Sequence, residues 1–456
     1  MLNTEFALIK KYNVPGPRYT SYPTAVQFRG IGEAQQIEER LKSNHDRRKN
    51  LSLYFHIPFC FSLCWYCGCT KIITKDADRG DHYIDYLEKE MDLAMAQLKG
   101  DRLVTQIHFG GGTPTFLRPD QLRRLGKAIK SRFSFDEQSE FSVEIDPRRC
   151  TAEHTVALAD IGCNRASLGV QDTNREVQEA IHRIQPFEET ERVTQLLRDS
   201  GINQINFDLI YGLPRQTPSR FRKTLDDVLQ LDPDRLAVYS YAHLPHLMPS
   251  QKLLDETEFP STEEKLGMIQ YAIESLPRLG MRFIGMDHFA REDDSLSRAL
   301  DQGTLQRNFQ GYSTHAETDM IAFGMSGISQ LEESYYQNTK DLGEYYRMID
   351  ENKLPVIKEL KLTRDDKIRK ALIMQIMCTS NLDFIEFSDK YGIDFESYFR
   401  EELENLDVME DDGLLIRMEN GIIITELGRL FLRNIAMTFD AYLKEPGREK
   451  RYSKTV

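Results

Sequence analysis

The sequence predicts an α/β protein built around an incomplete (β/α)6-type barrel, with an N-terminal arm and a small, mostly helical, winged-helix-like C-terminal domain. Three observations lead to this fold class. Short apolar runs alternate with amphipathic stretches from residue 51 to residue 286. A cluster of cysteines follows the first of these runs directly. Helical patterns near the C-terminus precede a hairpin signal. Because alternating strands and helices build a parallel sheet with crossover helices, the first observation sets the architecture.

The first predicted element is an N-terminal arm at residues 1–47. Its segment 16–25 (GPRYTSYPTA) places two prolines around two tyrosines, a composition that disfavours a helix. Such a segment is ordered only if it lies against another surface. From the pattern alone, a cover over the rest of the chain and a solvent-facing leader are equally good interpretations.

The main domain is predicted to span residues 48–355. In the stretch 81–98, Tyr83, Leu87 and Met91 recur at four-residue steps, which indicates a helix with one buried face. The periodicity by itself also permits a doubly wound open sheet. The apolar runs predict strands at 51–57, 106–110, 140–146, 166–171, 205–211, 236–242 and 282–286. The amphipathic stretches predict helices at 81–98, 118–132, 152–161, 187–200, 219–230 and 263–279.

The C-terminal domain is predicted at residues 356–456. Helical patterns at 363–378 and 394–406 precede two short β runs joined by Asn420 and Gly421, and Asn-Gly between apolar runs is a strong hairpin signal. Winged-helix-like units often bind DNA, but the acidic stretch 409–412 argues against that use here. A lid or packing domain for the barrel is the preferred interpretation.

Composition limits the class of protein. The chain has 456 residues, 40% of them hydrophobic and 29% charged, as in ordinary globular proteins. The net charge of −13 argues against a nucleic-acid partner. The N-terminus lacks the apolar core of a secretion signal, and no apolar run approaches the ~20 residues of a membrane span. Cysteines concentrated in one motif suit a reducing cytoplasm. We therefore expect a cytoplasmic monomer without a membrane or nucleic-acid partner.

Four of the seven cysteines form one motif after the strand predicted at 51–57. Cys60, Cys64, Cys67 and Cys69 have the spacing C-x3-C-x2-C-x-C. Thiolates this close can converge on one metal centre, and such sets suit iron–sulfur clusters or zinc. Zinc sites usually show two separated ligand pairs, and this chain has no second pair. A [4Fe–4S] cluster with three cysteine ligands and one open iron fits better, with zinc or unconnected thiols as the alternatives.

Further candidate residues stand where the predicted strands end, because the loops after the strands build the active site of β/α barrels. The glycine run 110–112 fits a ligand site or a tight strand–helix turn equally well. Glu144 fits a ligand contact or a helix cap. Asp208, among apolar neighbours, needs a hydrogen bond or an ion pair, for which Arg183 is a plausible partner. His288 beside Asp287 could be a catalytic pair, but a structural histidine is the more common case.

Several of these strings resemble a known family. The cysteine spacing with Tyr66 before the third cysteine resembles the signature of radical S-adenosylmethionine (SAM) enzymes. The strings YFHIPFC at 54–60 and CGC at 67–69 are similar to those of the oxygen-independent coproporphyrinogen III oxidases. So are RYTSYPT in the arm and NFQGYST at 308–314. The resemblance covers nearly the whole chain.

The resemblance implies a site. The cluster ligands would be Cys60, Cys64 and Cys67, with SAM on the open iron, and Cys69 would lie nearby without ligating. From local geometry alone, Cys69 could also complete a four-thiolate cluster that leaves no place for SAM. The arm would cover the mouth of the site, and two SAM molecules would bind. The first SAM would contact Tyr54, Tyr66, Gly111, Gly112, Thr113, Glu144 and the backbone of Ala242, and the second Gln171, Arg183 and Asp208. The implied catalytic residues are Tyr54, His56, Cys69, Phe309 and Gln310, with Phe309, Gln310 and Ile328 in the pocket for substrate and SAM.

The implied reaction is the oxidative decarboxylation of coproporphyrinogen III to protoporphyrinogen IX. A 5′-deoxyadenosyl radical would remove hydrogen from the β-carbon of each of two propionates, and loss of CO2 and one electron would leave a vinyl group. A low-potential electron donor and an electron acceptor are required. The alternatives are a haem chaperone that kept the radical-SAM scaffold, a paralogue acting on another tetrapyrrole, and a cluster-sensing regulator that binds DNA. The arm and Cys69 favour the oxidase over the chaperone.

Overall fold

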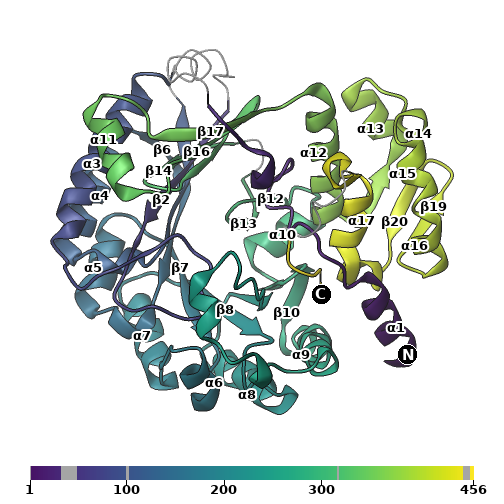
Figure 1. Ribbon diagram of the computed structural model, residues 1–456, viewed down its shortest axis with the longest axis horizontal. Coiled ribbons are helices and arrows are strands. Elements are labelled where there is room, and N and C mark those ends of the chain that lie inside the picture. The colour runs from purple at the N-terminus through teal and green to yellow at the C-terminus, as the bar shows by residue number, and fades with distance from the viewer. Residues whose placement is uncertain (1, 32–48, 99–101, 316–317, 445–451, 456) are drawn as a thin grey trace.

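A computed structural model describes residues 2–31, 49–98, 102–315, 318–444 and 452–455 (Figure 1). Most of the predicted arm falls within this part of the chain, whereas its end at 32–47 lies outside the described residues. No described helix combines the length and the apolar composition that crossing a membrane requires.

Parallel strands form the centre of one large sheet. Each strand pairs in parallel with the next along the chain, so that Tyr54 lies opposite His108 and Asp208 opposite Ala237. This order confirms the predicted strand–helix alternation. The strands are β2 (Leu51–Ile57), β5 (Leu103–Gly111), β6 (Ser134–Ile145), β7 (Arg165–Gln171), β8 (Gln204–Tyr211) and β9 (Arg235–Ser240). The crossover helices are α3 (Arg79–Met95), α4 (Pro119–Lys130), α5 (Ala152–Asp160), α6 (Arg175–Ala180), α7 (Phe187–Asp199) and α8 (Pro218–Leu229).

The sheet continues on both sides of this centre, to 13 strands in the described residues. One further strand, β14 (Asp319–Phe323), pairs in parallel with β2 and is buried along its whole length. Its sequence was not predicted as a strand, because five residues before a glycine-rich turn carry no periodic signal. The outer strands are antiparallel. They are β15 (Ile328–Gln330), β16 (Ser334–Asn338), β17 (Val356–Lys361) and β1 (Arg29–Gly30) beyond β14, and β11 (His288–Arg291) and β10 (Met281–Gly285) beyond β9.

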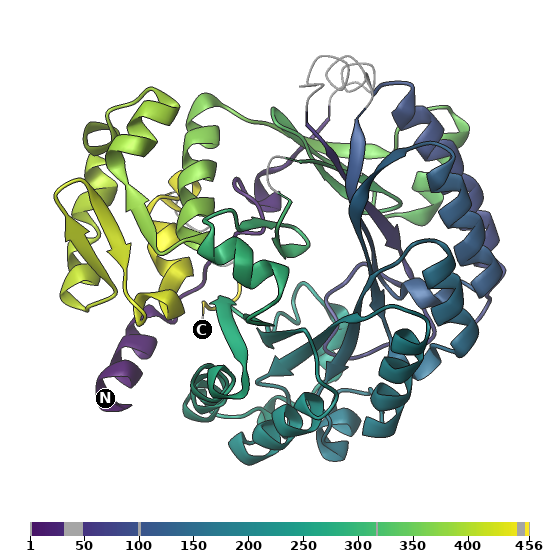
Figure 2. The same ribbon diagram turned by 180° about the vertical axis from the view of Figure 1, so that it is seen from behind.

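The sheet is curved and open. Helices α3, α4, α5, α7 and α8 lie along its convex side, and the C-terminal domain lies at the opening (Figures 1 and 2). A doubly wound sheet has helices on both faces, so the doubly wound alternative is wrong. In the described residues the edge strands β1 and β10 do not pair with each other, which makes this an incomplete barrel. Aromatic side chains fill the layer under the helices, where the Phe109 ring stands edge-on to Phe55 and Phe141.

The C-terminal domain is mostly helical and carries a three-stranded sheet in the order β18–β20–β19. The predicted hairpin is confirmed. The predicted helix at 394–406 is broken at Phe399, whose backbone leaves the helical region while its ring is fully buried against Phe395 and Phe439. The elements are α12 (Arg364–Cys378), β18 (Asn381–Asp383), α13 (Phe384–Tyr391), α14 (Phe395–Tyr398), α15 (Arg400–Glu404), α16 (Asp407–Asp411), β19 (Leu415–Met418), β20 (Gly421–Ile424) and α17 (Leu432–Thr438).

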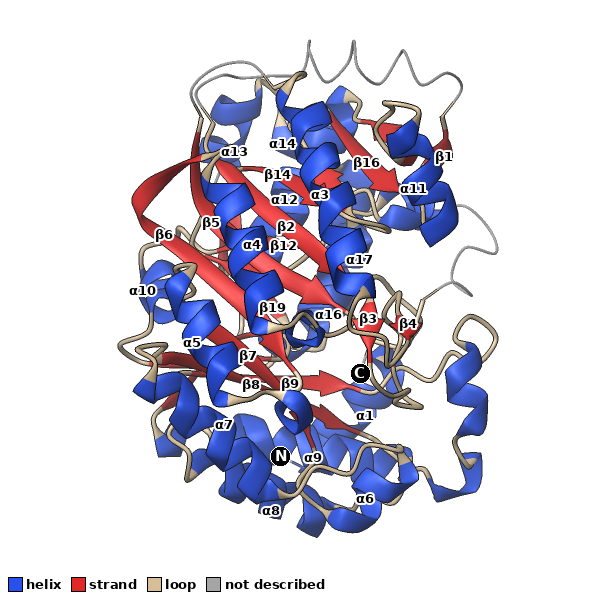
Figure 3. Ribbon diagram, turned by 90° about the vertical axis from the view of Figure 1, so that its left-hand side faces the viewer, coloured by secondary structure: helices blue, strands red, loops and turns tan. Residues whose placement is uncertain are grey.

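Shorter elements connect these layers. Strand β17 belongs to the large sheet although it follows the predicted domain boundary at 355. The short strands β3 and β4 stand at the end of the sheet where β2 finishes, with α3, α4 and α5 side by side in front of the strands (Figure 3). The connecting elements are α1 (Leu2–Tyr12), β3 (Phe59–Cys60), β4 (Ile72–Ile73), α9 (Thr262–Ser275), α10 (Ser295–Asp301), β12 (Gln306–Asn308), β13 (Gly311–Ser313) and α11 (Leu342–Asp350).

The proline-rich part of the arm is buried. Tyr19 and Tyr22 are 1% and 0% exposed. The Tyr19 hydroxyl donates to Asp440 of the C-terminal domain at 2.9 Å, and the Tyr335 hydroxyl of β16 donates to the Tyr22 carbonyl at 2.7 Å. Residues 16–25 therefore lie between the sheet and the C-terminal domain, and a solvent-facing leader is excluded for this segment.

Candidate active site

The cysteine loop leaves the carboxyl end of β2 and is tied to its neighbours by backbone hydrogen bonds. The Ile72 amide donates to the Pro58 carbonyl at 2.7 Å, and the Thr74 amide donates to the Cys60 carbonyl at 3.0 Å. On the other side, the Trp65 amide donates to the Ile181 carbonyl at 3.1 Å. These bonds fix both ends of the loop against the strand ends, where a β/α barrel forms its site.

The four cysteines differ in surroundings. Cys64 is buried and its sulfur accepts from Arg148 and Arg183, each at 3.5 Å. Cys60 lies 3.4 Å from the Thr113 hydroxyl. Cys69 is exposed and next to Cys67. Its hydrogen bond to Cys67, with help from Lys71, lowers the pKa of Cys67 to about 6.

This donor set fits an iron–sulfur cluster. Guanidinium groups beside a sulfur favour the thiolate, which is the form that binds iron. All seven cysteines are free thiols. Within the described residues no three His, Cys, Asp or Glu side chains are grouped as for a single metal ion. The ligands of a [4Fe–4S] cluster bind different irons, however, and need not converge on one point.

The glycine run packs against the cysteine loop. The amides of Gly111, Gly112 and Thr113 donate to Glu144, Ile57 and Phe59, at distances of 3.1, 2.8 and 2.9 Å. They are thus committed within the protein, which agrees with the tight strand–helix turn that the sequence left open beside a ligand site. The glycines are required by close approach. A side chain at Gly112 would place its Cβ 2.6 Å from the Pro58 carbonyl oxygen, and Gly111 has a φ of +113° with His56 beside it.

Glu144, on β6, faces the interior of the barrel. His108 donates to it through Nε2 at 3.2 Å, and the Tyr54 ring stacks on His108 with centroids 5.8 Å apart. Burial raises the pKa of Glu144, but the bonds from His108 and Gly111 outweigh burial and leave that pKa below its usual range. Glu144 is therefore an ionised carboxylate with 45% of its side chain exposed to the interior space.

His56 is held in one tautomer beside this group. Burial lowers the pKa of His56 to about 4, so the ring is neutral. Its Nε2 donates to the Thr70 carbonyl at 3.0 Å, which leaves Nδ1 to accept from the Tyr54 hydroxyl at 3.3 Å. Tyr54, His56 and the loop that carries Cys69 are thus connected directly.

Arg183 has a different partner from the one suggested by the sequence. It pairs with Asp146 at 3.2 Å and donates to the Gly169 carbonyl at 2.6 Å. Asp146 also pairs with Arg148 at 2.6 Å. The ion pair between Arg183 and Asp208, which the sequence left open as an alternative, is therefore not formed. Asp146 and Arg148 were missed as site residues, although the Asp-Pro-Arg sequence directly after a strand was an available signal.

Asp208, on β8, is held by neutral donors. The Ser167 hydroxyl and the Asn206 amide donate to it at 2.7 and 2.9 Å. Burial is the largest influence and raises the pKa of Asp208 to about 6, and the nearby Glu144 charge adds to this shift. Gln171, at the end of β7, has a φ of +69°, a strained value for a residue other than glycine. Its Nε2 atom and Nη2 of Arg183 lie 2.8 and 3.2 Å from the point where a Cβ on Gly169 would stand.

The remaining predicted residues surround this group at different distances. Gln251 donates to the carbonyls of both Tyr66 and Ala242, at 3.0 and 3.1 Å, and thereby joins the cysteine loop to the end of β9. Ile328 begins β15 and packs with Phe28 and Tyr335, next to the arm.

A cavity inside the barrel connects several of these side chains. Glu144, Asp208, His288 and Gln310 all line it. Phe309 and Gln310 form the turn between β12 and β13, at the inner side of the barrel. His288 donates through Nδ1 to the Asp287 carboxylate at 2.8 Å, and its ring stands edge-on to Tyr239 and Tyr312.

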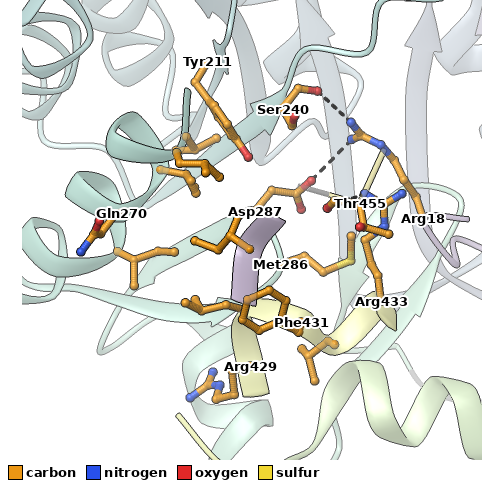
Figure 4. Close-up of a pocket in the computed structure, with 17 residues that line it drawn as sticks. Arg18, Tyr211, Ser240, Gln270, Met286, Asp287, Arg429, Phe431, Arg433 and Thr455 are labelled. Carbon is orange, nitrogen blue, oxygen red and sulfur yellow. Dashed lines mark hydrogen bonds and ion pairs between the residues drawn. The ribbon is translucent and has the colours of Figure 1, made fainter. Parts of the chain in front are cut away.

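A second cavity lies between the barrel and the C-terminal domain (Figure 4). Arg18 of the arm reaches into it and donates to the Ser240 carbonyl at 2.9 Å, with Asp287 at 3.6 Å. Arg433 lines it on the same side as Arg18, next to Thr455 (Figure 4). The arm and the C-terminal domain thus close the barrel on its open side.

Comparison with known proteins agrees with this geometry. The family model described as the radical SAM superfamily matches residues 54–228, and the one described as the HemN C-terminal domain matches residues 362–431. The chain is 46% identical over 463 residues to the oxygen-independent coproporphyrinogen III oxidase of Helicobacter pylori, covering 100% of both chains. It is 44% identical over 452 residues to that of Pseudomonas aeruginosa, covering 98% of both.

A solved structure gives the same result. Coproporphyrinogen III oxidase (HemN) from Escherichia coli, described as a radical SAM enzyme, superposes with a TM-score of 0.90 at 42% identity, covering 96% of this chain and 98% of that chain. Radical SAM enzymes use a [4Fe–4S] cluster and SAM, which fits the thiolate loop described above. By its full-length identity, its fold and its cysteine loop, the chain belongs to the family of oxygen-independent coproporphyrinogen III oxidases.

Proposed function

We propose that this chain converts coproporphyrinogen III to protoporphyrinogen IX by oxidative decarboxylation of two propionates. The observation that carries the proposal is the cysteine loop, in which Cys64 lies between Arg148 and Arg183 at the carboxyl end of a parallel sheet. Cys60, Cys64 and Cys67 would ligate the cluster, and Cys69 would remain free. The relatives that carry the oxidase name match the chain from end to end.

When bound, the cluster and SAM supply a 5′-deoxyadenosyl radical that takes hydrogen from a propionate β-carbon. The residues of the chain hold the reactants in place. SAM carries a sulfonium and an ammonium group, so a carboxylate such as Glu144, ionised through His108 and Gly111, complements it. Arg183, anchored by Asp146, would face the carboxylate end of a SAM molecule.

Two SAM molecules are part of the proposal. Glu144 and Asp208 are separate interior carboxylates on β6 and β8, with β7 between them. Tyr54, Tyr66, Gly111, Gly112, Thr113 and Ala242 would serve the first SAM with Glu144. Gln171 and Arg183 would serve the second with Asp208. Tyr54, His56, Cys69, Phe309, Gln310 and Ile328 would contact the substrate or SAM around the reacting carbon.

Three further features belong to the proposal. A low-potential donor would reduce the cluster, and an acceptor would take the last electron. Free thiols throughout the chain suit a reducing cytoplasm. We also propose a monomer, because arm, barrel and C-terminal domain of one chain close the open side of the sheet together.

One anaerobic assay tests the function. The cluster is reconstituted and the protein is given a low-potential reductant, SAM and coproporphyrinogen III, and products are followed by chromatography with mass detection. Loss of two CO2 per porphyrin with formation of 5′-deoxyadenosine is expected, and Cys64→Ala should abolish both. A preparation that kept its iron and its activity in air would argue against the mechanism.

Each of the other possible results would support one of the alternative functions. Formation of 5′-deoxyadenosine with an unchanged porphyrin would support the radical chemistry but exclude coproporphyrinogen III as the substrate, as expected of a paralogue. Haem binding without SAM cleavage would identify a chaperone. Salt-sensitive binding to DNA would favour a regulator.

A further inference from the structure

Arg307, on β12, is a buried cation whose guanidinium lacks hydrogen-bond partners. Its side chain is 7% exposed, and its Nε and Nη1 atoms are fully buried without an acceptor. No carboxylate of the described residues lies within ion-pair distance of it. The guanidinium carbon stands over the Tyr312 ring, 4.8 Å from its centroid. A ring face attracts a cation but accepts none of the in-plane N–H groups, so these donors remain unused.

Each of the other buried arginines of the described chain has at least one carboxylate or carbonyl partner, although Nη1 of Arg165 and Nε of Arg183 also lack an acceptor. Arg102 pairs with Asp319 at 2.7 Å, and Arg369 pairs with Glu402 at 3.0 Å. Arg165, Arg183, Arg235 and Arg433 likewise donate to carboxylates or backbone carbonyls. Burying an unpaired charge costs folding free energy. A buried arginine without an acidic partner therefore indicates a place where an anionic ligand binds.

Arg307 adjoins the interior cavity through Tyr312, which lines it. β12 and β13 form a hairpin in which Arg307 lies opposite Tyr312, and the Tyr312 hydroxyl is fixed to the Met377 carbonyl at 2.8 Å. Asp287, whose pKa the Arg307 charge helps to lower, is already held by His288 at 2.8 Å and by Arg18 at 3.6 Å.

The turn of the same hairpin has a second unused polar atom. Gln310 lines the interior cavity, and its Oε1 is buried without a donor. One short hairpin therefore offers both an unused cationic donor and an unused neutral acceptor. A ligand that satisfies both must carry an anion and an N–H group.

We propose that Arg307 binds a propionate carboxylate of the porphyrinogen and orients the macrocycle in the barrel. This inference rests on the proposed function and names a binding residue for its substrate. A tetrapyrrole at the reduction level of coproporphyrinogen carries carboxylates on its rim and pyrrole N–H groups at its centre. The carboxylate takes the Arg307 donors in a charge-assisted pair, and a pyrrole N–H donates to Gln310 Oε1.

The test compares Arg307→Met, Arg307→Lys and the control Arg369→Met. The ligand-free chains are titrated with coproporphyrin III, the air-stable oxidised form with the same propionates, and with its methyl ester, by tryptophan and porphyrin fluorescence. We expect the wild type to prefer the free acid. Arg307→Met should bind the acid roughly tenfold to a hundredfold more weakly and lose the preference, and Arg307→Lys should recover part of it.

Thermal stability distinguishes a ligand-binding role of Arg307 from a structural role. Because Arg307 has no hydrogen-bond or ion-pair partner among the described residues to lose, Arg307→Met should largely keep the thermal midpoint, whereas Arg369→Met should lower it and leave porphyrin affinity unchanged. An unchanged preference for the acid in Arg307→Met, or a drop in its midpoint like that of Arg369→Met, would overturn the inference.

The KM for coproporphyrinogen III in the anaerobic assay distinguishes failure of the inference about Arg307 from failure of the proposed function. If the wild type decarboxylates and Arg307→Met has the same KM, the inference fails and the function stands. If the wild type neither binds the porphyrin nor decarboxylates, the function itself fails.

Discussion

Gly112 sets how closely the end of β5 approaches the cysteine loop. Its amide donates to the Ile57 carbonyl, and the Pro58 carbonyl occupies the space where a Cβ would stand. The contact is with backbone on both sides, so no side chain can turn away to make room. The position of Cys60, three residues after Ile57, depends on this contact.

Gly112→Ala is therefore expected to displace the loop and to reduce cluster incorporation. Overpacking of this kind costs roughly 1–3 kcal/mol. The measurement is iron and sulfide per chain after anaerobic reconstitution. Gly30→Ala is the control, because a Cβ at Gly30 meets nothing within 4 Å. Equal iron content in both variants would show that the loop tolerates the shift.

Asp208 is a carboxyl group that changes charge near neutral pH. Burial raises the pKa of Asp208 to about 6, so it is ionised above that pH and neutral below it. If the anion binds SAM as proposed, SAM affinity should fall by roughly tenfold from pH 7 to pH 5. Equilibrium binding at these pH values checks this. Asp208→Asn should bind weakly and without this pH dependence, and a wild-type-like pH profile in the variant would assign the titration elsewhere.

At the scale of elements, Glu90 connects α3 to three segments that follow it by more than 200 residues. It accepts from the Gly324 amide after β14, from Asn338 of β16 and from Tyr345 of α11, each at 2.7 Å. These bonds place β14 beside β2, and thus bring the segment with Ile328 to the barrel. Burial nevertheless dominates and raises the pKa of Glu90 to about 7.

This raised pKa makes stability depend on pH. The pKa of Glu90 is about 7 in the folded chain against an ordinary value of 4.5, so its contribution to stability is complete below pH 4.5 and is lost as the pH rises through 7. Between pH 5 and pH 8 the free energy of unfolding should fall by up to about 3 kcal/mol more in the wild type than in Glu90→Gln. Urea unfolding at the two pH values measures this. Glu88→Gln, on the same helix, should retain the wild-type slope.

At the scale of the whole molecule, Arg433 of α17 fastens both ends of the chain. It donates to the carbonyls of Gly16, Pro17, Lys454 and Thr455. Its neighbour Asn434 donates to the Tyr12 carbonyl at 2.8 Å. The C-terminal domain thus holds the arm at the opening of the barrel, where Arg18 reaches Ser240.

Arg433→Met should release the arm, because buried carbonyls lose a charged donor, at a cost of about 1–3 kcal/mol. Hydrogen exchange of the amides between residues 15 and 24 should become faster, with little change in the strands of the barrel. Lys444→Met, in an exposed ion pair of the same domain, serves as the control. If protection of the arm were unchanged, its attachment would depend on Tyr19 and Tyr22 instead.

Local sequence determined a large part of this protein. The longer strands from β2 to β10 and the helices α3, α4, α5, α7, α8 and α9 follow from periodicity, because burial of one face imposes a repeat on neighbouring residues. The cysteine spacing predicted the place of the site for a similar reason, since ligands on one loop are close in sequence. The resemblance assigned the glycine run, Glu144 and Asp208 to the site. All of them lie at the inner side of the sheet or at the carboxyl ends of its strands.

Tertiary structure alone decided which distant side chains meet. Arg183 pairs with Asp146 and not with Asp208, β14 joins β2, and Phe399 interrupts a helix to fill the core of the C-terminal domain. Each outcome depends on contacts between segments far apart in the chain, for which periodicity holds no information. The unpaired state of Arg307 is of the same kind, because a missing partner is visible only when every neighbour is in place.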